Sequence, residues 1–444
     1  MNIEGLLDKA LAYERVDDLE VLAIRTRDEL TRFTDCQIHQ NVASDEVRLY
    51  LRAWVDGKTG VAETNEATEE GVRRAAQVAE GLARRQTKPA GYSPPGPQPA
   101  PDVPAWDQET WDASPKMRAE LVARVVKGPK EEGFNSSGSL STGGGEIWVA
   151  STTGVRAHTK STRARFVNVV SGQRGGSGYA EFSSVQLSDF RPEQAAQRAL
   201  DKALRTEDRQ ALEPGEYTVV LEEPAVATVL GMLSFMGFSA RALLERRSFM
   251  DGRLNQKLAS DLVTVYDDPL NPRGLPRPFD FEGVPTQRVY FFRQGVAEGV
   301  VHDTRTAVAS GTQSTGHALP PPYSAYSPMP GNVVMEEGAL SDDELLAGVE
   351  RGLLVTRFHY ARPVEPREGV MTMMTRDGTF LIEDGKVRGA VDDLRVTESG
   401  LRALSEVDAV GGAQQLITGG DGFGGFLVPK VRIRKFKFTG RTER

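Results

Sequence analysis

An Asp-Gly pair between two alternating apolar stretches predicts a β-hairpin near the start of the chain. Apolar side chains alternate over residues 47–54, Asp56-Gly57 follows, and a second arm spans residues 59–63. Asp-Gly in this setting is a strong hairpin signal because both residues tolerate the backbone of a tight turn. Thr68 predicts the start of a helix that places five side chains inward: Val72, Ala75, Ala76, Ala79 and Leu82. The first segment is therefore expected to be a unit of strand, hairpin and helix.

The same order of elements recurs further along the chain. Residues 146–158 and 164–172 are expected to form two strand arms, and Gly178-Tyr179-Ala180-Glu181 echoes Gly60-Val61-Ala62-Glu63. A second amphipathic helix is expected over residues 192–204, with Pro192 at its start. The repeat predicts an α+β fold class, with a duplicated N-terminal α/β sandwich domain in which two helices cover one mixed sheet. We place this domain at residues 1–205.

Two connecting segments have distinctive compositions. Residues 87–105 contain seven prolines, which exclude a helix and favour an extended connection inside the N-terminal domain. This segment is either a solvated linker or a flap over a cleft. A third helix is expected over residues 115–127. Residues 133–145 are rich in Gly and Ser without the Lys of a phosphate-binding loop, so we interpret them as a flexible turn.

Residues 206–444 change to short strands interrupted by Gly and Pro, which predicts a β-rich, barrel-like C-terminal domain. Asp377-Gly378 and Asp384-Gly385 are expected to be tight turns in an antiparallel meander. Ser341, with Glu344 three residues later, predicts a capped helix over residues 341–353. The expected strands span residues 216–221, 289–292, 299–302, 370–376, 379–383, 386–391 and 428–438.

Charge and cysteine content restrict the class of protein. The 444 residues carry a net charge of −8, which argues against a nucleic-acid-binding surface. The basic positions within residues 430–437 alternate with apolar ones, so they indicate a half-buried strand with a solvated basic face, the alternative being a nucleic-acid contact. The single Cys36 excludes an intramolecular disulfide and fits a reducing compartment. We interpret it as a small buried hydrophobe.

The apolar stretches do not predict a membrane protein. No stretch reaches the roughly 18 uncharged apolar residues of a membrane span. Residues 1–13 form an amphipathic pattern with Glu4 and Asp8 and lack the basic start and apolar block of a signal peptide. The longest apolar candidate, residues 224–240, is expected to be a core helix. We therefore expect a cytoplasmic protein with no membrane contact.

Motifs spread along nearly the whole chain resemble, in order, the TldD/PmbA metallopeptidase family. They include Phe281-Glu282-Gly283-Val284-Pro285, Asp303-Thr304-Arg305-Thr306-Ala307 and Ser314-Thr315-Gly316-His317-Ala318. Residues 374–380 and 382–386 continue the series, and residues 32–41 and 60–65 match near the other end. The order of so many motifs is more specific than any one of them.

The resemblance implies a branch of that family without the metal-binding motif. The TldD-like branch carries His-Glu-x-x-x-His on a helix and a Cys near the C-terminus, which together bind zinc. Those helix positions map onto Leu233, Ser234 and Phe238, and the Cys position falls within residues 419–425, which contain Asp421 and no Cys. Leu and Phe side chains cannot bind zinc, and Ser cannot act as a base near neutral pH. We therefore expect no catalytic residues and no metal in this chain.

The implied function is that of a non-catalytic TldE/PmbA-like subunit. A TldD-like partner would supply zinc in a heterodimer that degrades or matures short or unfolded peptides. The alternative is a peptide- or protein-binding modulator without a peptidase partner. A homodimeric hydrolase with another active site would need a nucleophile and a base, and the sequence shows neither a Gly-x-Ser-x-Gly elbow nor a Cys-His arrangement.

Other candidate residues follow from the same motifs. Five positions either line a substrate cleft or only shape turns: Arg305, Thr306, Ser314, Thr315 and His317. The five His residues have no metal-binding spacing, and a lone His is more often structural. Glu222 and Glu223 precede the helix of residues 224–238, and we expect both adjacent carboxylates to be solvated rather than an acid/base pair.

Overall fold

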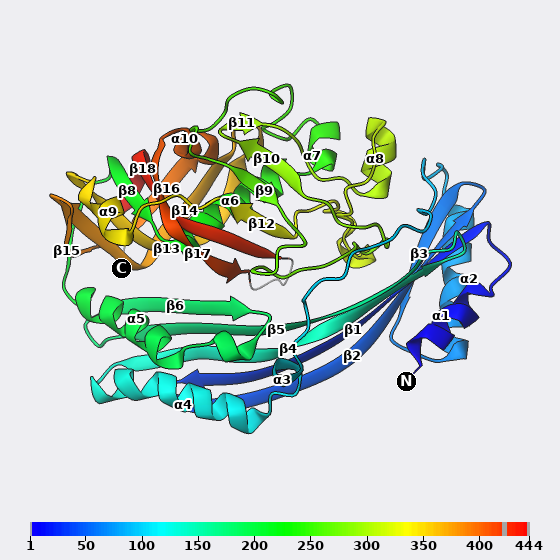
Figure 1. The fold of residues 1–444 in the computed structure, drawn as a ribbon, viewed down its shortest axis with the longest axis horizontal. Helices are drawn as coiled ribbons and strands as arrows, with labels where there is room; N and C mark the ends of the chain where they lie inside the picture. The colour runs from blue at the N-terminus through cyan, green and yellow to red at the C-terminus, as the bar shows by residue number, and fades with distance from the viewer. Residues whose placement is uncertain (1, 420–423, 442–444) are drawn as a thin grey trace.

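Two β-sheets organise the chain, one of six strands and one of twelve. The computed structural model describes residues 2–419 and 424–441. In Figure 1 the six-stranded sheet is long and curved, and the strand-rich C-terminal half lies across one of its faces. Residues 206–215 connect the two halves and include the short strand β7 (Arg209–Gln210). The fold class is the predicted α+β arrangement.

The six-stranded sheet has the order β3-β2-β1-β4-β5-β6. The sequence predicts a mixed sheet here, but every pairing in it is antiparallel. Consecutive strands are joined by hairpins, which produce only antiparallel neighbours, and the two halves of the sheet meet through β1 and β4. The strands are β1 (Asp18–Thr34), β2 (Gln37–Val55), β3 (Lys58–Thr64), β4 (Asn135–Ser151), β5 (Arg156–Ser171) and β6 (Ser177–Ser184).

The predicted duplication is present as two units of helix, three strands and helix. The first runs from α1 (Ile3–Leu11) through β1, β2 and β3 to α2 (Glu69–Arg85). The second runs from α4 (Pro115–Glu131) through β4, β5 and β6 to α5 (Pro192–Arg205). Short helical turns lie beside the second unit, α3 (Gln108–Trp111) and the 3₁₀ turn η1 (Leu187–Asp189).

The repeated glycines occupy equivalent places in the two units. A Cβ built on Gly60 would lie 2.2 Å from the carbonyl oxygen of Ala79 in α2, and one on Gly178 would lie 1.9 Å from that of Ala199 in α5. Each glycine therefore lets its edge strand pass directly beneath a helix. On α2, Leu82 was expected to point inward, but it is 38% exposed and Ala83 is buried instead. The helical repeat of 3.6 residues places position 83, rather than 82, on the buried face.

Side chains along β1 alternate between two different cores. Leu19 and Val21 pack with α1 and α2 on one face, whereas Leu22 packs with Phe279 of the C-terminal half on the other. Near the far end of β1, Phe33 packs with α4 on the helix face. Helices α1, α2, α4 and α5 thus cover one face of the sheet, and the C-terminal half covers the opposite face (Figure 1).

The Gly/Ser-rich residues 133–145 are not the flexible turn that their composition predicts. From Asn135 onward they form the first half of β4, which pairs with β1 on one side and β5 on the other. A Cβ on Gly143 would lie 1.9 Å from the Arg27 oxygen of β1, and one on Gly144 would lie 2.0 Å from the Ser161 oxygen of β5. Glycine is used here because neighbouring strands approach closely, a requirement that is not local in sequence.

The proline-rich segment is extended, as predicted, and is held against the first sheet. Trp54 donates from Nε1 to the Tyr92 carbonyl at 3.1 Å. Thr153 donates from Oγ1 to the Pro95 carbonyl at 2.6 Å, and the Thr162 amide donates to Ala105 at 2.8 Å. Residues 87–105 therefore follow the surface of the N-terminal half along their length.

The twelve-stranded sheet is partly ring-like. Strand β18 pairs with β8 and β16, β8 pairs with β13, and β13 pairs with β14, which returns to β16. This closure agrees with the predicted barrel-like domain. The ring strands are β8 (Glu216–Leu221), β13 (Arg351–Glu365), β14 (Val370–Glu383), β16 (Leu394–Ser399) and β18 (Gly425–Arg441). The other strands are β9 (Val265–Asp267), β10 (Val289–Arg293), β11 (Val296–Ala297), β12 (Asn332–Met335), β15 (Lys386–Val391) and β17 (Val407–Thr418).

Helix α6 (Glu223–Gly237) packs on the apolar inner side of this ring. Its Val229, Leu230 and Leu233 share one core with residues of β13 and β18. The remaining helices are short and lie around the ring. They are α7 (Ala240–Leu244), α8 (Thr304–Ser310), α9 (Asp342–Ala347) and α10 (Gly400–Ser405), with 3₁₀ turns η2 (Pro321–Tyr323) and η3 (Pro366–Glu368).

Three local predictions in the C-terminal half are wrong. Asp377-Gly378 is not a turn but a bulge inside the continuous strand β14, with φ of 57° and 129°. Residues 299–302 form only an isolated bridge at Val301 instead of a strand. The helix begun by Ser341 ends at Ala347, because the chain then enters β13 and pairs with β8. The Ser341 and Glu344 capping box and the Asp384-Gly385 turn are as predicted.

The basic residues near the C-terminus lie on strand β18. Val431, Ile433, Phe436 and Phe438 are buried, which confirms a half-buried strand. Arg432 donates from Nε to Asp408 at 2.9 Å and Lys430 pairs with Asp342, whereas Arg434, Lys435 and Lys437 are exposed, as expected for a solvated basic face. Cys36 is buried and free, and among the helices of the described residues none is long and apolar enough to span a membrane.

Candidate functional site

A cleft of about 570 Å³ lies between the six-stranded sheet and the loops of the C-terminal half. Its floor is the middle of β1, β4 and β5, on the face opposite the long helices. Its roof comes from residues 269–281 and from segments near residues 323 and 331. The floor residues are Ile24, Thr26, Asp28, Gly144, Gly145, Ile147, Thr159, Ser161 and Arg163.

The floor is hollow because its central side chains are short. Gly144 and Gly145 carry no side chain, and Thr26 and Ser161 on the flanking strands add only small hydroxyl groups. The larger apolar residues stand at the margins, with Phe281 on the roof. The glycines that allow close strand pairing in β4 therefore also leave an open trough above the sheet.

The cleft contains one arginine that lacks a counter-ion among the described residues. Arg277 lines the roof, and its guanidinium carbon lies 4.9 Å from the centre of the Phe281 ring. Its Nε is buried without a hydrogen-bond partner, and its side chain forms no ion pair with the part of the chain that the structure describes. Burial lowers the pKa of Arg277, against the opposing charges of Asp280 and Asp267.

Those two aspartates are engaged elsewhere. Asp280 accepts hydrogen bonds from the amides of Glu282, Val284 and Ala318 at 2.9–3.0 Å, and burial raises its pKa to about 8. Asp267 Oδ1 accepts from the backbone amides of residues 331 and 332, while its Oδ2 bonds His317 Nε2 at 2.8 Å. Neither carboxylate is placed to pair with Arg277.

His317 belongs to a buried network behind the cleft. Its ring lies between Asp267 and Thr315, whose Oγ1 is 2.9 Å from His317 Nδ1. The Thr315 hydroxyl also donates to the His302 carbonyl at 3.1 Å, and Ser314 Oγ donates to the same carbonyl at 3.2 Å. These bonds hold residues 314–317 against His302. A direct role of these residues in a cleft stays a prediction.

Arg305 and Thr306 lie beside a second, smaller cavity of about 250 Å³. Thr306 forms a capping box with Asp303 at the start of α8, so its hydroxyl is used locally. Arg305 is exposed at the cavity rim. The cavity floor holds a buried pair in which Arg52 donates to Glu282 at 2.9 Å, an ion pair that joins the two halves of the chain. The structure thus separates the five predicted cleft residues into two groups.

Helix α6 and the residue that follows it, Phe238, hold the three positions where the resemblance places a zinc motif. Leu233 and Phe238 are completely buried, and Phe238 stacks on Phe291 at 4.0 Å between ring centres. Ser234 is buried and donates its hydroxyl to the Leu230 carbonyl at 2.8 Å. Residues 420–423, including Asp421, lie outside the described residues. Within residues 2–419 and 424–441, no group of three or more His, Cys, Asp or Glu is arranged to hold a metal.

Glu222 and Glu223, at the start of α6, are not solvated, contrary to expectation. Glu223 is 6% exposed, and burial raises its pKa. Although burial also raises the pKa of Glu222, its ion pair with Lys202 holds it below the ordinary value. Both residues lie where the start of α6 meets α5 and β18, so packing between the two halves removes them from water.

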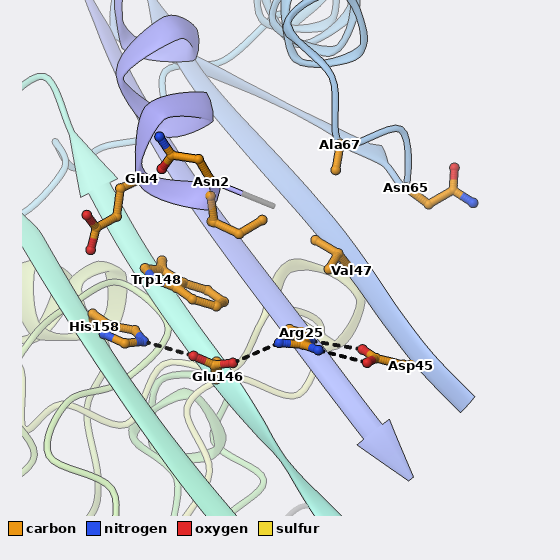
Figure 2. Close-up of a pocket in the computed structure, with 11 residues that line it drawn as sticks. Asn2, Glu4, Arg25, Asp45, Val47, Asn65, Ala67, Glu146, Trp148 and His158 are labelled. Atoms are coloured by element: carbon orange, nitrogen blue, oxygen red, sulfur yellow. Dashed lines mark hydrogen bonds and ion pairs between the residues drawn. The ribbon is translucent and has the colours of Figure 1, made fainter. Parts of the chain in front are cut away.

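A further hollow on the helix face of the first sheet provides a contrast. It measures about 750 Å³ and is lined by strands β1, β2 and β4 and by the start of α1. In Figure 2, Arg25 pairs with Asp45 at 2.8 Å and with Glu146 at 3.2 Å, and His158 lies 3.4 Å from Glu146. The charged side chains at the floor of this hollow therefore form ion pairs with one another, whereas Arg277 in the cleft forms none with the described residues.

Arg277 is the site residue that the sequence does not reveal. It lies in a loop rich in Pro, outside the motifs that carry the family resemblance. Asp267, Asp268 and Asp280 are close in sequence and would suggest local charge pairing. Only the three-dimensional arrangement shows that Asp267 and Asp280 are bound to other donors and that the guanidinium faces a cleft.

Three domain models match consecutive parts of the chain. They are described as PmbA/TldA metallopeptidase domain 1 at residues 19–83, the central domain at residues 94–207 and the C-terminal domain at residues 214–440. A metalloprotease of Methanothermobacter thermautotrophicus is 26% identical over 59% of this chain and 58% of its own length. A metalloprotease TldD homolog of Haemophilus influenzae is 27% identical over 56% of this chain and 52% of its own. The chain spans about half the length of the curated relatives it matches.

Solved structures share the fold over almost the whole chain. The crystal structure of TldE from Thermococcus kodakarensis superposes with a TM-score of 0.87 and 22% identity, covering 99% of both chains. A Thermotoga maritima structure, named for a proposed role as modulator of a DNA gyrase, gives a TM-score of 0.86 and 19% identity. It covers 98% of this chain and 100% of the other. At these identities the likeness establishes the fold.

Proposed function

The chain belongs to the PmbA/TldD metallopeptidase family, and from that premise we propose that it is the non-catalytic, TldE-like subunit of a heteromeric zinc metallopeptidase. A TldD-like partner would supply the zinc ion and the catalytic base. Short or unfolded peptides would be the substrates, degraded or matured by the assembled enzyme. The proposal places the complex in the cytoplasm, where a single buried Cys36 stays reduced.

The packing of α6 is the observation that carries the proposal. The three positions that the resemblance assigns to the metal motif are Leu233, Ser234 and Phe238. Zinc sites in proteins use imidazole, thiolate or carboxylate ligands, and none of these side chains provides one. The Phe238 ring also fills the space beside it, against Phe249, Phe291 and Phe292. The residues do not fit a zinc ion, so we assign no catalytic step to this chain.

The cleft indicates what this chain contributes instead. A floor of glycines and small hydroxyl residues between apolar margins suits an extended chain that lies along a sheet. Peptides bound in this way make main-chain contacts, which give affinity with little sequence preference. In the proposed complex this chain binds and orients the peptide, and the partner activates water.

Native mass spectrometry tests the proposal directly. The chain is measured alone and after co-expression with the TldD-like protein of the same genome. We expect a metal-free chain that forms a heteromer containing one zinc ion for each partner subunit. Zinc bound to the isolated chain, or no association with the partner, would contradict the proposal.

A peptide-binding modulator without a peptidase partner is the second candidate. The observation that favours it is that residues of both halves of this chain line the cleft. Such a protein would bind peptides as a monomer or homomer and co-purify with no metallopeptidase subunit. Affinity purification from the native organism, followed by identification of associated chains, separates the two candidates.

A further inference from the structure

We propose that Arg277 binds a carboxylate group of the peptide held in the cleft. The inference rests on the proposed function only for the class of ligand, a peptide. It adds a recognition residue and a chemical preference that neither the family resemblance nor the domain matches assign.

Arg277 is half-buried, and the charges of Asp280 and Asp267 act on it without forming an ion pair. Its Nε has no hydrogen-bond partner, and its side chain makes no ion pair with the described residues. A buried donor of a charged group that has no acceptor is costly, and proteins normally pair such groups or leave them in water. A ligand that brings a negative charge would complete the site.

The geometry leaves one side of Arg277 open to the cleft. The Phe281 ring supports the guanidinium through a cation–π contact at 4.9 Å. A Cβ on Gly331 would lie 3.0 Å from Arg277 Nη2, so the glycine keeps this edge of the guanidinium free of a neighbouring side chain. Planar N–H groups are thus presented toward a space of about 570 Å³. A carboxylate matches this planar fork.

Three other arginines around the cleft and hollows, Arg163, Arg52 and Arg25, are paired. Arg163 on the cleft floor lies 3.7 Å from Asp28, and Arg52 is bound to Glu282. On the helix face, Arg25 is held by Asp45 and Glu146. Among these arginines, Arg277 alone lacks a protein carboxylate within the described residues. This difference points to a ligand rather than to a structural ion pair.

A peptide offers a carboxylate from two sources, its C-terminus or an acidic side chain. Isothermal titration calorimetry with four N-acetylated octapeptides of Ala, Ser and Val distinguishes them. One peptide ends in a free acid and one in an amide, and two further amides carry a central Glu or Gln. We expect the full chain to bind at least one carboxylate peptide about tenfold more tightly than its neutral counterpart.

Substitution of the arginine supplies the second arm of the experiment. Arg277→Gln should abolish the preference for the carboxylate peptide, whereas Arg277→Lys should retain part of it. Arg273→Gln is the matched control, because Arg273 lies in the same loop, is exposed and pairs with Glu337 at 3.4 Å. Equal binding of acid and neutral peptides by the wild type, binding of neither, or an unchanged preference in Arg277→Gln would overturn the proposal.

The melting temperature of a variant without ligand shows whether Arg277 has only a structural role. Arg277→Met preserves an unbranched side chain over Phe281 and removes the charge. If Arg277 serves a ligand, this variant should unfold at a temperature equal to or above that of the wild type. A clear drop in its melting temperature would assign Arg277 to the fold and overturn the proposal.

The outcome is separable from that of the proposed function. Peptide titrations are run on the chain alone and on the zinc-containing heteromer. A heteromer that forms without any carboxylate preference would reject the role of Arg277 and leave the subunit assignment intact. A carboxylate preference in a chain that never associates with a peptidase would keep the role of Arg277 and reject the subunit assignment.

Discussion

Single residues in this molecule are often explained by a partner far away in sequence. Gly60 and Gly178 permit two helices to lie on two edge strands, and Gly143 permits one strand to pair closely with another. Arg277 differs because it has no such partner among the described residues. The nearby carboxylates of Asp280 and Asp267 are bound to backbone amides instead. At this scale, the role of a residue follows from the space and the charges around it.

Replacement of either repeated glycine should destabilise the fold. In Gly60→Ala or Gly178→Ala the new methyl group would overlap helix backbone, so we expect a loss of about 1–3 kcal/mol in the free energy of unfolding. Gly81→Ala is the control, because Gly81 lies in α2 and a Cβ there meets nothing within 4 Å. The free energy of unfolding of Gly81→Ala should rise by up to about 1 kcal/mol. Urea denaturation of the three variants checks the prediction, and equal effects at positions 60 and 81 would contradict it.

Stability should fall with rising pH because of Glu181. Burial raises the pKa of this carboxyl from 4.5 to about 7. Between these values the folded chain keeps a proton that the unfolded chain releases, so the folded state loses stability as pH rises and the effect is complete above pH 7. The total decrease in the free energy of unfolding from this one group is about 3 kcal/mol. Denaturation at pH 5 and pH 8 should show a smaller loss for Glu181→Gln than for the wild type.

The exposed Glu120 on α4 provides the control for that measurement. Glu120→Gln should keep the pH dependence of the wild type. A Glu181→Gln variant that loses as much stability as the wild type between the two pH values would show that other groups carry the effect.

Among the elements, α6 has the most demanding environment. Its buried face packs inside the ring of strands, and only a narrow side that includes Phe235 reaches the surface. The same helix carries Leu233 and Ser234, which the resemblance aligns with metal-binding positions of the catalytic branch. Here both side chains are buried in the core.

Truncation of two phenylalanines tests this description of α6. Phe238→Ala should reduce the free energy of unfolding by about 3–5 kcal/mol, because the ring is completely buried among three others. Phe235→Ala, at a position that is 39% exposed, should cost about 1 kcal/mol or less. Chemical denaturation measures both values. Similar losses for the two variants would contradict the assignment of separate faces.

Elements with local signals were predictable, and elements defined by distant pairing were not. Asp56-Gly57 forms the expected turn with φ of 50° and 71°, and Thr68 caps α2. The identical dipeptide Asp377-Gly378 instead forms a bulge, because β13 pairs along both sides of it. Gly-rich β4 was missed for the same reason. A dipeptide specifies a local backbone, but the neighbouring strand decides whether the chain turns.

The candidate site also has one part that the sequence predicts and one part that depends on distant strand pairing. The family motifs include Thr315 and His317, which are hydrogen-bonded in a segment behind the cleft. The cleft itself depends on which residues of β1, β4 and β5 face the C-terminal half, and β4 was interpreted as a turn in its relevant part. The floor of the cleft and the unpaired state of Arg277 could therefore be recognised only from the three-dimensional structure.

At the scale of the whole molecule, a few polar contacts join the two halves. Arg52 in β2 donates to Glu282 at 2.9 Å, Ser183 Oγ lies 2.7 Å from Thr418 Oγ1, and Gln415 donates to the Glu181 carbonyl at 2.9 Å. The apolar cluster around Leu22 and Phe279 adds to them. The relative position of the halves, and hence the shape of the cleft, depends on this interface.

Removal of the buried interfacial carboxylate should weaken that interface. In Glu282→Ala, the buried Arg52 keeps only the ion pair with Glu20 at 3.6 Å. We therefore expect the free energy of unfolding to fall by about 3 kcal/mol or more. Differential scanning calorimetry should show the two halves unfolding less cooperatively than in the wild type. Glu298→Ala, which breaks the exposed pair with Arg293, is the control and should cost about 1 kcal/mol or less. Equal effects of the two variants would contradict a special role for the interfacial pair.

The cleft takes its floor from residues 24–163 and its roof from residues 269–332, so any molecule bound there touches both halves. Its binding energy adds to the contacts that hold the halves together. If a protease nicked the backbone within residues 206–215, the two fragments would remain associated through their interface, and a bound peptide would slow their separation. Dissociation of the nicked protein would then report on occupancy of the cleft without any measurement of catalysis.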